Sequence, residues 1–72
     1  MKKTTPNYNK ISNQIQCVIR EIHMRERCYP SMVARGKIDQ AVADYELNCM
    51  KAVYQTLCAA ERAHLDKTWN NQ

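Results

Sequence analysis

The sequence predicts an all-α protein, an antiparallel helical hairpin with helices over about residues 8–28 and 39–65 and a short helical turn over about residues 30–35. The chain of 72 residues has one glycine and two prolines, and residues that favour helices dominate it. Apolar residues recur at helical spacing in both halves. This length indicates one domain, residues 1–72, and we expect residues 1–7 and 70–72 to be frayed.

The first predicted helix has one apolar stripe. Its members step by four, three and four residues: Ile11, Ile15, Val18 and Ile22. Thr5 followed by Pro6 is a plausible start, with Asn7 and Asn9 as competing caps. Glu21 and Arg25, four residues apart, form a favourable pair. Tyr29-Pro30 should end this helix, because the residue before a proline avoids helical geometry.

The joint between the helices contains the only glycine. Pro30 can occupy the first position of a separate helical turn over residues 30–35. Gly36 can then adopt the left-handed conformation that ends such a turn. Met32 and Val33 are expected to close the end of the core.

The second predicted helix begins at Asp39, a good capping residue. Its apolar side chains form a broad face rather than a narrow seam: Ile38, Val42, Tyr45, Cys49, Met50, Ala52, Val53, Leu57 and Ala60. We expect Ile22 and Leu57 to be buried between the helices. A lone hairpin leaves half of such faces exposed, so we predict a homodimer that forms a four-helix bundle.

Basic residues are concentrated in one half of the chain. Residues 1–37 carry eight Lys and Arg against two acids, whereas residues 38–72 carry three against five. The cluster around the joint is the candidate partner-binding site, and it comprises Arg20, Arg25, Arg27, Tyr29, Arg35 and Lys37. Arginine suits phosphate and carboxylate recognition, although an Arg-rich helix end can equally be a solvated surface.

Motifs for catalysis, cofactors or metals are missing from the sequence. The four cysteines form no Cys-x-x-Cys pair. A zinc site formed by Cys17, Cys58 and His64 is conceivable, but the sequence has no closely spaced pair of ligands to support it. We therefore predict no enzyme, no cofactor and no metal. Neither a signal peptide nor a membrane span is indicated, so we expect a cytoplasmic protein without membrane contact.

A longer pattern resembles a family of small proteins of phages and bacterial prophages. It reads Arg-Glu-x-x-Met-Arg-x-Arg-x-Tyr-Pro-x-x-Val-x-x-Gly-Lys-Ile from Arg20 to Ile38, followed by Ala43, Glu46, Met50 and Ala52-Val53. The resemblance covers about residues 18–57 and implies a phage or prophage origin and a bacterial host cytoplasm. It implies no activity and no functional residues. Phage proteins of this size are often inhibitors or adaptors that bind a host protein, and this expectation rests on analogy with that class of proteins.

Three functional hypotheses follow. The first is an interaction protein that binds and modulates a host or phage protein. The second is a nucleic-acid-binding accessory protein that uses the basic N-terminal half, with salt-dependent affinity. The third is a structural component of the phage particle or its assembly.

Overall fold

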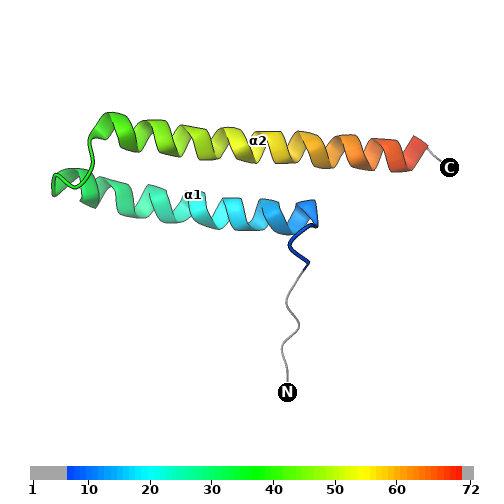
Figure 1. Ribbon diagram of the computed structural model, residues 1–72, viewed down its shortest axis with the longest axis horizontal. Coiled ribbons are helices and arrows are strands. Elements are labelled where there is room, and N and C mark those ends of the chain that lie inside the picture. Colours follow the sequence, from blue (N-terminus) through cyan, green and yellow to red (C-terminus); the bar gives the residue numbers. More distant parts are fainter. Residues whose placement is uncertain (1–6, 71–72) are drawn as a thin grey trace, which may run out of the picture.

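A computed structural model describes residues 7–70 of the chain, with side chains for residues 7–65. Two helices, α1 (Ile11–Ala34) and α2 (Gln40–Asn70), run antiparallel and pack side by side (Figure 1). The described residues contain no strand. The predicted all-α helical hairpin is therefore confirmed, while the suggested start at Thr5-Pro6 lies outside the described residues.

The turn before α1 explains why this helix begins three residues later than predicted. The Asn7 side-chain Oδ1 accepts a hydrogen bond from the Asn9 backbone N–H at 2.9 Å, and the Asn7 carbonyl accepts one from the Lys10 N–H at 3.2 Å. An Asx turn of this kind competes with helical geometry. Two helix side chains then hold the turn, because Asn13 Nδ2 donates to the Asn7 carbonyl and Gln14 Nε2 to the Tyr8 carbonyl.

The first helix does not end at residue 28, so the predicted separate turn over residues 30–35 is wrong. The helix α1 continues through Pro30 to Ala34. Proline lacks the N–H that would bond to the carbonyl of Glu26, at a cost of about 3 kcal/mol in a helix interior. Tyr29 nevertheless stays helical, and its side chain is anchored to α2 by a hydrogen bond to Glu46. The Tyr29-Pro30 dipeptide therefore does not end the helix, and the contact of Tyr29 with α2 is one of the interactions that favour its helical conformation.

Gly36 adopts the predicted left-handed conformation, but it ends α1 and not a separate turn. Its φ is +72°, in the left-handed region. The Gly36 N–H donates to the Val33 carbonyl at 3.0 Å, and the Lys37 N–H donates to the Met32 carbonyl at 2.8 Å. These two bonds form a Schellman motif, which satisfies carbonyls left open at a helix end.

The second helix begins where the sequence predicts and ends later. Asp39 directly precedes α2, and its carbonyl accepts the first helical hydrogen bond, from the Ala43 N–H at 3.0 Å. The backbone of α2 remains helical five residues beyond the predicted end at residue 65, to Asn70. Neither helix, over its described residues, has the length and apolar character needed to cross a membrane.

The interior of the hairpin is very small. Of the side chains described, only Ile15 and Ala43 are buried, with 8% and 3% of their surface exposed. Ile22 and Leu57 face the partner helix but are half-buried, so the prediction that they are buried is wrong for the hairpin alone. A single layer of two helices, 13 Å across its thinnest dimension, has no second layer to cover them.

Candidate functional site

A polar network joins the two helices near the joint. Arg25 of α1 forms an ion pair with Glu21 on its own helix, 2.9 Å from Nε to Oε1, and a longer one with Glu46 of α2, 3.4 Å from Nη1 to Oε1. The Tyr29 hydroxyl donates to the same Glu46 oxygen at 2.9 Å. The Arg25 guanidinium also lies over the Tyr29 ring, 5.9 Å from its centre. Glu46 therefore anchors α2 to two residues of α1.

The electrostatics of this network agree with its geometry. Partial burial and the hydrogen bond to Glu46 both raise the pKa of Tyr29, because both favour the protonated phenol. The hydrogen bond to Glu21 raises the pKa of Arg25. Both side chains belong to the predicted binding cluster, and the structure places both in contacts within the chain.

A second ion pair links the two helices. Lys51 Nζ of α2 lies 3.4 Å from Glu26 Oε2 of α1. Nothing in the sequence pattern indicated that Glu26 and Glu46 make contacts across the hairpin. The predicted pair between Glu21 and Arg25 is confirmed. As a result, both carboxylates of α1 form ion pairs within the hairpin.

The outer face of α1, turned away from α2, is basic. Arg20, Met24, Arg27 and Ser31 step by four, three and four residues, which places them on one face of a helix. All four are exposed, and Met24 has 54% of its surface exposed. We call these four residues the outer face of α1. Glu21 and Glu26 are the only acids of α1 and pair with Arg25 and with Lys51 of α2, so this face presents positive charge with no carboxylate on it.

The remaining members of the predicted cluster lie at the joint. Arg35 and Lys37 flank Gly36 and are exposed. The six candidates thus form three groups. Arg25 and Tyr29 join the helices, Arg20 and Arg27 lie on the outer face of α1, and Arg35 and Lys37 extend the positive charge around the end of the hairpin. The Arg20 guanidinium also donates to Cys17 Sγ at 3.2 Å.

An apolar groove runs between the helices on one side of the hairpin, in the half away from the joint. It has a volume of about 660 Å³. Its walls come from both helices and from the turn before α1, and its lining residues are Asn7, Tyr8, Asn13, Gln14, Cys17, Val18, Arg20, Val53 and Leu57. The sequence indicated excess apolar surface on both helices but could not show on which side it would remain open.

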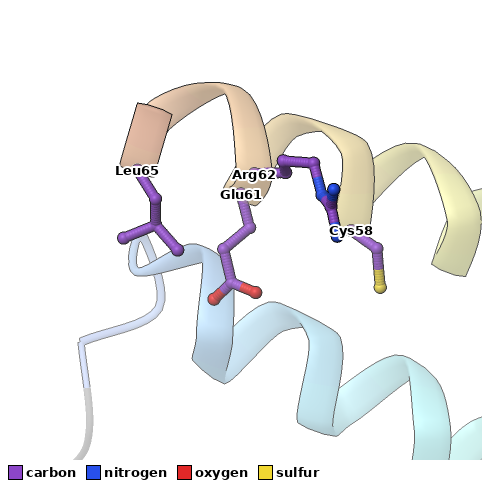
Figure 2. A pocket seen from close by; sticks show the side chains of 4 residues that line it. All are labelled: Cys58, Glu61, Arg62 and Leu65. Atoms are coloured by element: carbon purple, nitrogen blue, oxygen red, sulfur yellow. The ribbon is translucent and has the colours of Figure 1, made fainter. Parts of the chain in front are cut away.

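A more polar hollow lies at the open end of the hairpin. It has a volume of about 430 Å³ and is lined by Cys58, Glu61, Arg62 and Leu65, whose side chains Figure 2 shows. Hydrogen bonding to Cys58 raises the pKa of Tyr54 on the preceding turn of α2. Cys17 lines the apolar groove and His64 lines a third hollow, so the three residues of the possible zinc site lie in three different hollows. Among the described residues, no three His, Cys, Asp or Glu side chains are grouped closely enough to hold a metal ion.

Comparison with known proteins identifies no relative of this chain. No family model, no curated protein and no solved structure matches the chain.

Proposed function

We propose that this protein is a non-enzymatic interaction protein that binds and modulates an acidic protein of a host or a phage through the outer face of α1. The observation that carries the proposal is the separation of charge on α1. Glu21 pairs with Arg25 on its own helix and Glu26 pairs with Lys51 of α2, while Arg20 and Arg27 are exposed on the outer face of α1. Arginine forks pair well with carboxylates, so an acidic surface is the matching partner.

Met24 favours a protein over a nucleic acid as the partner. It lies between Arg20 and Arg27 on the same face and is 54% exposed. Met and Arg are both enriched in protein interfaces, and the flexible thioether adapts to apolar surfaces. A phosphate backbone gains nothing from a thioether, whereas an acidic protein helix with an apolar position between two carboxylates would contact all three side chains.

Nucleic acid binding is the second candidate function, supported by the same positive charge. Arg35 and Lys37 continue the charge of the outer face around the joint. Such a surface would bind a phosphate backbone without reading bases, and its affinity would fall steeply with salt.

Charge reversal on the outer face tests the proposal. The variant Arg20→Glu with Arg27→Glu changes two exposed residues, whereas Arg25→Glu would break the contacts between the helices. Arg62→Glu, on α2 at the open end, is the matched control. Tagged wild-type protein and both variants are used to capture partners from bacterial host lysate treated with nuclease, and the captured partner is then purified for titration. We expect the control variant to bind the partner. For the double variant we expect each lost ion pair to cost about 1.4 kcal/mol of binding free energy, which weakens the affinity by at least about tenfold for each pair.

Two results would overturn this assignment. Equal binding by the double variant would exclude the outer face of α1. A partner that is captured from untreated lysate but not from nuclease-treated lysate would indicate nucleic acid. Together with direct binding of labelled DNA that weakens on addition of salt, this result would establish the second candidate function instead.

A further inference from the structure

We propose that a second copy of this chain packs on the apolar groove, face to face, so that two hairpins form a four-helix bundle. The groove is the surface defined above, of which Tyr8, Cys17, Val18, Val53 and Leu57 form the apolar part. This inference goes beyond the proposed function. The two surfaces meet at Arg20, which lies on the outer face of α1 and also lines the groove, so dimerisation is tested at Val53, which belongs to the groove alone.

The hairpin alone leaves an unusual amount of surface exposed. The chain has 6297 Å² of accessible surface at a mass of 8.4 kDa. A compact monomer of that mass would expose about 4,600 Å². The difference of roughly 1,700 Å² exceeds the roughly 800 Å² that each partner buries in a stable complex of standard size. The chain as a whole therefore exposes more surface than a compact monomer of its mass, which agrees with a hairpin that lacks a second layer.

The groove has the composition of an unfilled core. Tyr8 is 81% exposed and Val53 is 42% exposed, although both are apolar over most of their surface. No carboxylate lines the groove, and its only charged residue is Arg20. The Arg20 side chain is anchored to Cys17 at the edge of the groove. A thiol does not neutralise a guanidinium, but a second apolar surface can pack here while the Arg20 head group stays in water at the rim.

A second copy suits the groove better than a different helix does. Among its described side chains the hairpin buries only Ile15 and Ala43, so it needs a cover whenever it is folded, and its own copies are always present. A two-fold axis through the groove places the same apolar strip on both sides, as a symmetric dimer requires. Two single layers of helices then become two packed layers with a shared core, which is the geometry of a four-helix bundle.

The oligomeric state and one matched pair of variants test the proposal. Val53→Glu places a charge in the groove at a position that is already partly exposed in the hairpin. Ala59→Glu places the same charge six residues further along α2, about 120° around the helix and outside the groove. By light scattering we expect twice the mass of the chain for the wild type and for Ala59→Glu. For Val53→Glu we expect at least about a hundredfold weaker dimer, because the charge would lose its water without gaining a partner.

Some outcomes overturn the proposal. A helical wild-type monomer at all concentrations would show that no second copy covers the groove. Equal dimerisation by Val53→Glu and Ala59→Glu would place the dimer interface elsewhere.

Thiol reactivity decides the case in which Val53→Glu fails to fold. In the hairpin alone Cys17 is exposed and Cys58 is half-buried, so Cys17 should react faster with an alkylating reagent. A second copy on the groove would cover Cys17 and leave Cys58, at the open end, unchanged. Two variants are used, each of which keeps either Cys17 or Cys58 and has Ser or Ala in place of the other three cysteines. Each variant gives the alkylation rate of the cysteine that it keeps. Slower reaction of Cys17 than of Cys58 supports the dimer, and faster reaction of Cys17 overturns it.

Discussion

Tyr29 of α1 and Glu46 of α2 are joined by a hydrogen bond of 2.9 Å, although they are seventeen residues apart in the chain. Arg25 contacts the same carboxylate at 3.4 Å. One acidic side chain thus contacts two positions of α1, close to the joint that connects the two helices. This contact sets the register of the hairpin.

The first prediction is that Tyr29 and Glu46 are energetically coupled. Tyr29→Phe and Glu46→Gln should each lower the urea midpoint of unfolding, because each weakens the same hydrogen bond. The double variant should lose less than the sum of the two single losses. Urea unfolding of the four proteins, followed by circular dichroism, measures the coupling. Strictly additive losses would mean that the bond contributes nothing to stability.

The second prediction concerns alkaline pH. The folded state raises the pKa of Tyr29, so the protonated phenol stabilises the fold. That stabilisation is complete below the ordinary tyrosine pKa of about 10 and is lost as the pH rises through the higher folded value. Unfolding midpoints measured from pH 8 upward should therefore fall less in Tyr29→Phe than in the wild type. Tyr45 and Tyr54, whose pKa values are raised by hydrogen bonds to Cys49 and Cys58, remain in both proteins. Identical pH profiles would contradict this role of Tyr29.

Pro30 gives the third prediction. Because Pro30 lies inside α1, it leaves the Glu26 carbonyl without its helical donor. Pro30→Ala restores that donor and should stabilise the hairpin by about 1–3 kcal/mol, with a higher helical signal. Chemical denaturation of the two proteins measures the gain. A loss of stability instead would indicate that the rigid proline ring restricts the unfolded chain more than it disturbs the helix.

The fourth prediction separates backbone strain from crowding at Gly36. A Cβ atom at Gly36 would meet no heavy atom within 4 Å, but the φ of +72° is unfavourable for residues with a side chain. Gly36→Ala should therefore destabilise the hairpin by about 1–2 kcal/mol through the backbone alone. Gly36→Asn should cost less, since asparagine tolerates the left-handed region better. Thermal melts of both variants check this order, and equal melting of all three proteins would show that the Schellman motif does not limit stability.

Much of the fold could be predicted from the residues because its signals are local. The spacing of the isoleucines in α1 and the glycine after Arg35 require no knowledge of distant contacts. Pro30 misled the interpretation, since its local signal is opposed by the Tyr29–Glu46 bond, which exists only once the helices are paired. For the same reason Arg25 and Arg27 looked equivalent in the sequence. Only the register of the hairpin shows that Arg25 joins the helices while Arg27 remains exposed.

The fifth prediction contrasts two isoleucines of the same stripe. Ile15 is 8% exposed, whereas Ile22 is half-buried against α2. If the hairpin alone determines stability, Ile15→Ala should cost about 2–4 kcal/mol and Ile22→Ala clearly less, because the cost rises with the apolar surface and the cavity lost. Urea unfolding of the wild type and both variants, at the protein concentration used for light scattering, measures both costs. A cost for Ile22→Ala as large as that for Ile15→Ala would mean that Ile22 is covered in the folded protein by more than α2, since two helices in a single layer leave it half open to water.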